Sequence, residues 1–165
     1  MASTLSANTK AKAYGELSDR IDVTRFFGGG DFSPDRYLFG WAAPEENHNW
    51  NDGAEVGYLL KLSSVPHEAC RIRVEGAPFV QANVPSQEVT LYANGLRLGS
   101  WTLTGDERVI LEAEIEPEQW LVRDGAAIGK LRWHIPHSIA PGRIGFGSDE
   151  RQLGFCFMSV TVTSG

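Results

Sequence analysis

From residue 54 onward, the chain repeats short segments rich in valine, isoleucine, leucine, threonine and aromatic residues, with glycine or proline between most of them. Segments of this length and composition favour β-strands. Their spacing, with turn signals between them, is typical of a β-sandwich. We expect strands over residues 55–62, 70–74, 88–93, 101–104, 108–115, 128–135 and 154–163, and a further strand over 21–27.

Two of these segments alternate in hydrophobicity. In one, Cys70, Ile72 and Val74 are expected to share a face opposite Arg71, Arg73 and Glu75. In the last segment, one face is expected to carry Cys156, Met158, Val160 and Val162, and the other Phe157, Ser159, Thr161 and Thr163. Alternation with period two is typical of antiparallel sheets that have one buried and one solvated face. We therefore expect an all-β fold, an antiparallel β-sandwich of the jelly-roll type.

Turn signals mark the ends of several segments. Asn94 and Gly95 both accept the positive φ angles that a tight type I′ hairpin requires. The run 28–31, Gly-Gly-Gly-Asp, lacks the lysine of a phosphate-binding loop and is expected to form a flexible turn. One short helical turn is expected over 116–122. Residues 1–20 lack periodicity, so we expect a polar tail or edge segment there and a single β-sandwich domain over 21–165.

The charge and cysteine content limit the classes of function. The net charge is −6 and the arginines are spread over the strands, whereas binding to nucleic acid needs a concentrated basic face. No apolar run is long enough for a signal peptide or a membrane span. Cys70 and Cys156 are expected to be buried thiols, although a disulfide would be possible between neighbouring strands. We expect a cytoplasmic protein, or a domain excised from a larger one.

The sequence contains few patterns of metal-binding or catalytic residues. His134 and His137 are the closest histidine pair, and in an extended chain they point to opposite faces, which disfavours a zinc site. Asp31 and Asp35 are candidate calcium ligands beside the glycine run, although solvated carboxylates are more common there. No other cofactor is expected. Glycoside hydrolysis, for which a carboxylate pair is needed, is the least favoured function; the candidates are Glu45, Glu46, Asp52 and Asp149.

Two clusters far apart in the sequence combine aromatic, amide and charged residues. Exposed tryptophans stack on the C–H faces of sugars, while carboxylates, amides and arginines hydrogen-bond the hydroxyl groups. The same residues could instead be structural, with the tryptophans in the core and the carboxylates holding the arginine. The sequence leaves both arrangements open for Trp41, Glu45, His48, Asn49, Trp50 and Asn51 in the first cluster and for Asp149 and Arg151 in the second.

The order of these motifs resembles that of a known kind of domain. A Gly-Trp pair, a glutamate four residues on, a second Trp, a glycine, an Asn-Gly hairpin and a terminal Asp-x-Arg-x-Leu-Gly are similar to jelly-roll, carbohydrate-binding-module-like domains. Such domains are attached to bacterial glycosyltransferases and cell-surface polysaccharide enzymes. The resemblance spans residues 39–162 and rests on Gly40, Trp41, Glu45, Trp50, Gly53, Asn94, Gly95, Asp149, Arg151, Leu153 and Gly154.

We therefore expect a non-catalytic carbohydrate-recognition module associated with bacterial polysaccharide metabolism, whose partner is a glycan or a polysaccharide-related enzyme. The expected stacking residues are Trp41 and Trp50, and the expected polar contacts are Glu45, Asn49, Asp149 and Arg151. The alternative is a scaffolding module that binds a protein partner or its own copy without binding sugar. Exposed strand edges and apolar side chains such as Phe155 and Phe157 would carry that contact.

Overall fold

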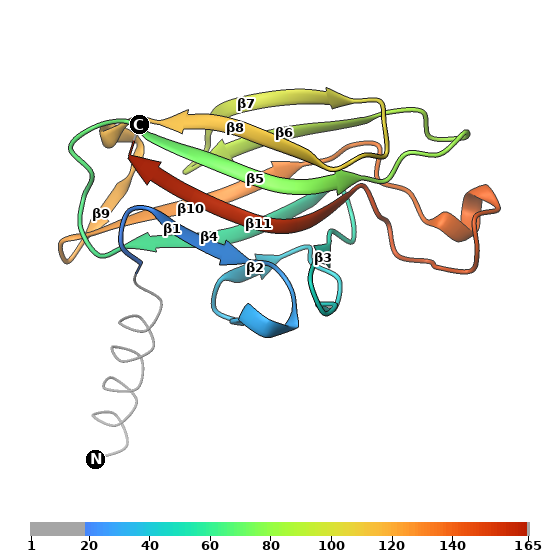
Figure 1. Ribbon diagram of the computed structural model, residues 1–165, viewed down its shortest axis with the longest axis horizontal. Coiled ribbons are helices and arrows are strands. Elements are labelled where there is room, and N and C mark those ends of the chain that lie inside the picture. The colour runs from blue at the N-terminus through green and yellow to red at the C-terminus, as the bar shows by residue number, and fades with distance from the viewer. Residues whose placement is uncertain (1–18, 165) are drawn as a thin grey trace, which may run out of the picture.

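The computed structural model describes residues 19–164, which form two antiparallel β-sheets packed against each other (Figure 1). The strands are β1 (Val23–Phe26), β2 (Tyr37–Phe39), β3 (Asn49–Trp50), β4 (Glu55–Leu62), β5 (Cys70–Pro78), β6 (Gln87–Ala93), β7 (Leu96–Leu103), β8 (Val109–Ile115), β9 (Leu121–Arg123), β10 (Ala126–His134) and β11 (Phe155–Ser164). One sheet, here called the β11 sheet, has the order β1-β11-β5-β8, with β3 also paired to β11. The other, the β10 sheet, has the order β2-β4-β10-β6-β7, with β9 paired to β10. The expected antiparallel β-sandwich is confirmed.

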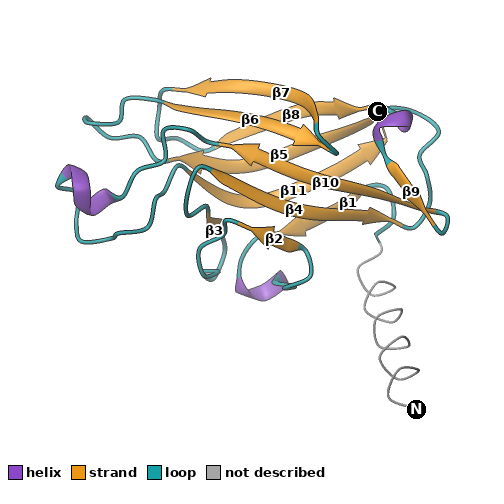
Figure 2. Cartoon of the chain, turned by 180° about the vertical axis from the view of Figure 1, so that it is seen from behind, coloured by secondary structure: helices purple, strands orange, loops and turns teal. Residues whose placement is uncertain are grey.

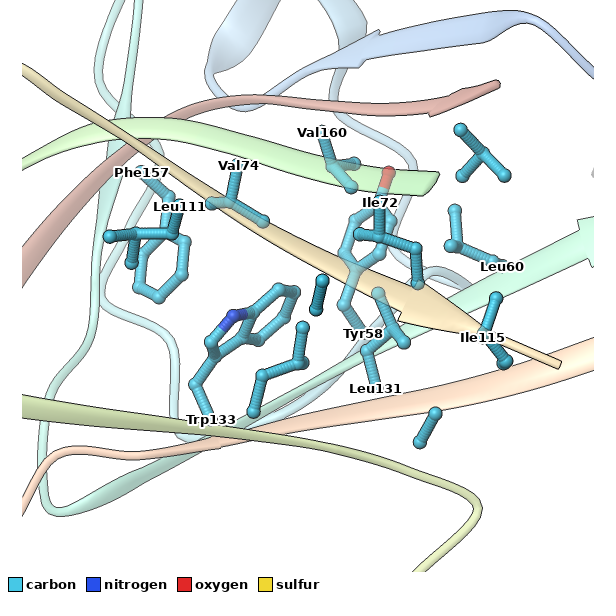
Figure 3. Packing of buried hydrophobic residues seen from close by; sticks show 14 of the residues in the cluster. Tyr58, Leu60, Ile72, Val74, Leu111, Ile115, Leu131, Trp133, Phe157 and Val160 are labelled. Carbon is cyan, nitrogen blue, oxygen red and sulfur yellow. The ribbon is translucent and has the colours of Figure 1, made fainter. Parts of the chain in front are cut away.

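The core lies between the two sheets and consists of the side chains that face inward from both (Figure 3). Tyr58, Leu131 and Trp133 come from the β10 sheet, and Ile72 and Phe157 come from the β11 sheet. Each of these five side chains is at most 1% exposed. Burial of one such side chain stabilises the fold by about 1.5–3 kcal/mol, so this layer holds the two sheets together.

Strand β5 alternates as its sequence predicts. Cys70, Ile72 and Val74 are buried, whereas Arg71 and Arg73 are exposed. The two arginines lie on the outer face of the β11 sheet, where Arg73 pairs with Glu112 of β8 at 2.9 Å. One face of β5 therefore supplies the core and the other is solvated.

Strand β11 does not keep a single apolar face. Its register with β5 shifts between Phe157 and Ser159, which marks a β-bulge at Met158. The extra residue reverses the side on which later side chains lie. The core therefore receives Phe155, Phe157, Val160 and Val162.

The predicted face of the last strand, which combined Cys156 and Met158 with Val160 and Val162, is therefore wrong. Cys156 and Met158 point to the outer side of the sheet, because they alternate with core residues before the bulge. Phe155 and Phe157, expected as exposed contacts for a protein partner, are both 0% exposed. They cannot carry such a contact in this fold.

Two tight hairpins connect neighbouring strands. Asn94 and Gly95 have φ angles of 50° and 83°, which confirms the predicted type I′ geometry between β6 and β7. Asp124 and Gly125, with φ angles of 52° and 77°, make a second turn of the same kind between β9 and β10. Asp-Gly is the same turn signal as Asn-Gly, so this hairpin was also detectable in the sequence.

Within residues 19–164 the helices are short 3-10 turns in the connections between strands (Figure 2). The turn expected over 116–122 is present as Pro117–Gln119, but the chain then extends into β9. The turn expected over 28–31 is present as Gly29–Asp31, whereas the turn Pro141–Ile144 was not predicted. Strand β7 joins the segment after the Asn94-Gly95 hairpin to the strand expected over 101–104. None of these described helices is long and apolar enough to cross a membrane.

The predicted tail, residues 1–20, falls mostly outside the described residues. Asp19 is described and is buried beside β4, where its backbone N–H donates to the carbonyl of Lys61 at 2.7 Å. Its carboxylate accepts hydrogen bonds from Arg25 Nε at 2.9 Å and from Arg36 Nη1 at 2.8 Å. Asp19 therefore belongs to the sandwich, and the division into a tail and a domain over 21–165 stays a prediction.

Both cysteines are buried and free. Cys70 pairs with Ser164 at one end of the β5–β11 ladder, and Cys156 pairs with Ala77 near the other end. A disulfide requires Cα atoms within about 7 Å of each other, which this register does not allow. The expectation of two buried thiols is confirmed.

Candidate functional site

The two sequence clusters meet at one end of the sandwich, where β3 lies beside the start of β11 (Figure 1). Asn51 joins them and is 0% exposed. Its side-chain oxygen accepts hydrogen bonds from the backbone N–H groups of Gly154 at 2.9 Å and Phe155 at 2.8 Å. Its side-chain nitrogen donates to Gly53 O at 2.7 Å and to Ser138 Oγ at 2.8 Å. A fully bonded amide in the interior fixes three segments relative to each other.

Asp52 and Gly53 extend this connection toward Gln152. The backbone N–H of Gln152 donates to the Asp52 carboxylate at 2.9 Å, and the backbone N–H of Gly53 donates to the Gln152 carbonyl at 2.9 Å. The Asp52 carboxylate therefore fixes the backbone at Gln152 by a hydrogen bond. Part of the first cluster is therefore structural, but the lock is made by Asn51 and Asp52 and not by carboxylates that hold the arginine.

Trp41 packs at the edge of the core. Its ring stacks on Phe27 with 5.3 Å between ring centroids and meets Phe157 edge-on at 4.9 Å. Its indole nitrogen donates to the carbonyl of Gly57 at 2.6 Å. These contacts occupy both the ring and its polar atom, so the structural arrangement describes Trp41 better than sugar stacking does.

Trp50 lies on the opposite, outer side of the β11 sheet. It pairs with Cys156 of β11, which in turn pairs with Ala77 of β5, so the three residues form one row across the sheet. A groove of about 640 Å³ lies over this row. The bulge at Met158 shapes its floor, because it keeps Cys156 and Met158 on the outer face while the valines that follow enter the core.

Further aromatic rings line the Trp50 groove. Phe79 meets Trp50 edge-on with 6.4 Å between ring centroids, and Phe146 follows at 6.1 Å from Phe79. His48 lies on the other side of Trp50 at 6.3 Å. Phe146 is 54% exposed, so this aromatic row begins within the groove and ends at its solvent-exposed rim.

The charged residues of the Trp50 groove are Asp149 and Arg151 from the second cluster, together with Asp106. Arg151 donates to Asp149 from Nε at 3.0 Å and from Nη2 at 2.6 Å, while about a third of each side chain stays exposed. The hydrogen bonds from Arg151 hold the pKa of Asp149 below its ordinary 3.8. Nη1 of Arg151 has no hydrogen-bond partner among the described residues. It can therefore donate to a ligand without breaking the pair.

The carboxylate of Glu45 hydrogen-bonds to the imidazole of His48. One carboxylate oxygen is 2.8 Å from His48 Nε2, and the expected pairing of Glu45 with Arg151 is replaced by the Asp149 pair. Glu45 is exposed and stays close to the groove. Burial and, secondarily, the Glu45 charge raise the pKa of Cys156 to about 12, so this thiol is uncharged near neutral pH.

Asn49 does not reach the groove. It pairs with Phe157 in the β3–β11 ladder and is 0% exposed. Neither side-chain amide atom of Asn49 has a hydrogen-bond partner among the described residues. A fully buried amide cannot contact a sugar at the surface, so the expectation that Asn49 binds a ligand directly is not supported by its position.

Calcium binding by Asp31 and Asp35 stays a prediction. Asp35 is exposed in the loop before β2, and the side chain of Asp31 lies outside the described part of the chain. Within the described part, no group of three or more histidine, cysteine, aspartate or glutamate residues could hold a metal ion. Of the glycines before Asp31, Gly28 packs closely, since a Cβ there would lie 2.8 Å from the backbone nitrogen of His48.

The structure therefore brings Trp50, Asp149 and Arg151 together and leaves Glu45 at the edge of the groove. Phe79 and Phe146 were missed by the sequence reasoning. Phe146 stands between two glycines in a loop, an arrangement that favours an exposed ring and could have drawn notice. Phe79 carries no such signal, because it immediately follows an ordinary strand.

No protein-family model matches this sequence, and no curated protein matches it. Solved structures with a similar fold do exist. A family GH115 4-O-methyl-α-glucuronidase with specificity for decorated arabinogalactans superposes with a TM-score of 0.51 at 9% sequence identity over 90% of this chain. The match covers 18% of the glucuronidase chain, so the chain described here spans less than a fifth of that enzyme.

Smaller domains are similar along most of their length. A family 35 carbohydrate-binding module from an environmental isolate has a TM-score of 0.44 and 12% identity, covering 90% of this chain and 92% of the module. The xylan-binding CBM22-1 domain of Xyn10C from Paenibacillus barcinonensis has a TM-score of 0.47 and 12% identity, covering 89% and 97%. At these identities the likeness concerns the fold alone: the chain is a β-sandwich similar to carbohydrate-binding-module-like jelly rolls.

Proposed function

We propose that this protein is a non-catalytic carbohydrate-recognition module that binds glycan in the Trp50 groove. The observation that supports this most strongly is the aromatic row of Trp50, Phe79 and Phe146 beside the Asp149–Arg151 pair. Aromatic faces bind the apolar sides of sugar rings, and the ion pair offers oriented donors and acceptors to hydroxyl groups. A role in bacterial polysaccharide metabolism is part of this proposal.

The chemistry of the groove favours binding over hydrolysis. A glycosidase needs a carboxylic acid that keeps its proton near neutral pH, which requires a raised pKa. Asp149 is the groove carboxylate with the closest cationic partner, and its pKa is lowered by Arg151. Asp52, another carboxylate considered from the sequence, accepts a backbone hydrogen bond from Gln152 instead of facing a ligand. These residues suit recognition, in which no proton is transferred.

The experiment is a binding screen by affinity electrophoresis and calorimetry, with hydroxyethylcellulose, glucomannan and arabinoxylan as probes. The Trp50→Ala and Phe146→Ala variants are expected to weaken binding about tenfold or more, because each loses one stacking surface. Phe39→Ala is the matched control, since Phe39 is 46% exposed on the β10 sheet while Phe146 is 54% exposed. Unchanged affinity in both groove variants would refute the assignment of the site.

A second candidate function, a scaffold that binds a protein, rests on a different surface. Leu38, Phe39 and Leu121 are between 42% and 48% exposed and line a hollow on the β10 sheet. Exposed apolar side chains gathered in this way mark contact surfaces in many proteins. Size-exclusion chromatography with light scattering tests whether the chain binds its own copy. A protein that stays monomeric at all concentrations would contradict this self-association.

A further inference from the structure

The Trp50 groove continues into a second hollow on the outer face of the β11 sheet. The second hollow has a volume of about 890 Å³, and its lining includes Phe26, Glu75, Arg108 and Ser159. His48 and Met158 line both hollows. Because the same two side chains border each space, the two hollows adjoin along the bulged part of β11.

The register of the strands places the second hollow on the same face as the first. Phe26 of β1 pairs with Ser159 of β11, and Ser159 pairs with Glu75 of β5. This row crosses the sheet beside the row that contains Trp50 and Cys156, with the bulge at Met158 between them. The two rows therefore form a continuous floor that runs along the outer side of the β11 sheet.

Exposed aromatic rings stand at both ends of this floor. Phe146 is 54% exposed beside the Trp50 row, and Phe26 is 61% exposed beside the Ser159 row. An exposed aromatic ring beside a hollow offers an apolar face on which a sugar ring can stack. Phe26 lines the second hollow and Phe146 lines the Trp50 groove, so each of the two adjoining hollows has its own exposed ring.

The charged groups along the floor are mostly neutralised in pairs. Arg108 Nε lies 2.7 Å from Glu75, and Arg151 Nη2 lies 2.6 Å from Asp149. Glu46 and Asp106 also line the hollows and have no ion-pair partner among the described residues. Arg25 lines the second hollow as well, so the described lining carries three arginines against four carboxylates. The surplus charge is therefore negative, and a polyanionic glycan would be repelled by it.

We propose that the two hollows form one extended site that takes an internal stretch of an uncharged linear polysaccharide. This inference rests on the proposed carbohydrate recognition and adds to it the length and charge of the ligand. Rings at both ends suit a chain that enters at Phe146, crosses Trp50 and Met158, and leaves past Phe26. The paired charges along the floor then hydrogen-bond neutral hydroxyl groups on the way.

The test compares oligosaccharides of increasing length, cut from whichever neutral polymer binds, with the intact polymer and with polygalacturonate. Affinity of the wild-type protein is expected to rise with length until both hollows are filled. The Phe26→Ala variant is expected to bind the polymer about tenfold more weakly than the wild type. For the shortest oligosaccharide that contacts Trp50, the variant and the wild type are expected to have the same affinity. The Arg108→Ala variant changes a second residue of the same hollow and is also expected to weaken polymer binding. Phe39→Ala is the aromatic control.

The outcomes separate this inference from the proposed function. If Trp50→Ala weakens polymer binding while Phe26→Ala and Arg108→Ala do not, the site ends at Met158 and the extended site is wrong. Tighter binding of polygalacturonate than of the neutral polymers would overturn the inferred charge of the ligand. Absence of binding to every glycan by the wild-type protein would remove the proposed function and the extended site together.

Discussion

Neighbouring residues of the first cluster have opposite roles. Trp41 and Asn51 are fixed inside the fold by ring packing and by hydrogen bonds, whereas Trp50 lies in a surface groove. Composition alone cannot separate these roles, because both kinds of position use the same residue types. The separation follows from β3, in which Trp50 pairs with the outward-facing Cys156 and therefore points outward itself.

Asn51 should be highly sensitive to substitution. Replacement by alanine removes two acceptor and two donor contacts and leaves the backbone N–H groups of Gly154 and Phe155 unpaired. We expect Asn51→Ala to lower the free energy of unfolding by about 3 kcal/mol. Urea denaturation measures the change, with the exposed Asn47→Ala as the control. A loss of less than about 0.5 kcal/mol would show that the lock is not needed.

Asp149 should titrate at a lower pH than an ordinary aspartate. Hydrogen bonds from Arg151 stabilise its charged form and lower its pKa below 3.8. The contribution of the pair to stability is therefore present above the unfolded-state pKa and is lost as the pH falls through the lower folded-state pKa. Carboxyl NMR titration should show this low value in the wild type and a higher value in Arg151→Gln, which loses the guanidinium hydrogen bonds and keeps the backbone one. Equal values in both proteins would contradict the pairing.

At the scale of elements, the bulge in β11 has the largest functional consequence. It lets one strand place Cys156 and Met158 under the groove and still give Val160 and Val162 to the core, because without the bulge these four side chains would share one face. The alternation of the sequence predicted a single face, because a bulge adds one residue without a distinct residue signature. Only the register with β5 reveals it.

The glycine run before β2 is a docking element for the loop that holds His48. Gly28 has a φ of 128°, and a Cβ there would lie within 2.9 Å of the backbone of Glu45, Glu46 and His48. We expect Gly28→Ala to lower the melting temperature by several degrees and to weaken glycan binding, because the loop must move away. Gly30→Ala is the control, since a Cβ at Gly30 meets nothing within 4 Å. Equal melting temperatures for the two variants would refute this role.

At the scale of the whole molecule, the sandwich follows from local patterns while the groove does not. Alternation and β-branched segments predicted most strands, and Asn94-Gly95 predicted its hairpin, because these signals act within a few residues. The groove joins Trp50, Phe79 and Phe146 from three separate connections and strands. Their meeting depends on the order of strands in the β11 sheet, which local patterns do not specify. The motif resemblance found Trp50, Asp149 and Arg151, but not the phenylalanines.

The central claim, that Trp50 contacts a glycan, is tested most directly by tryptophan fluorescence with acrylamide quenching. The wild type and Trp50→Phe are titrated with hydroxyethylcellulose, glucomannan and arabinoxylan. The other tryptophans are held in or against the core, where Trp120 and Trp133 are buried and Trp41 and Trp101 pack on it. We predict that one glycan protects the wild-type emission from quenching and that this protection is absent in Trp50→Phe. Protection that persists in Trp50→Phe, or binding without any change in the wild-type emission, would contradict the claim.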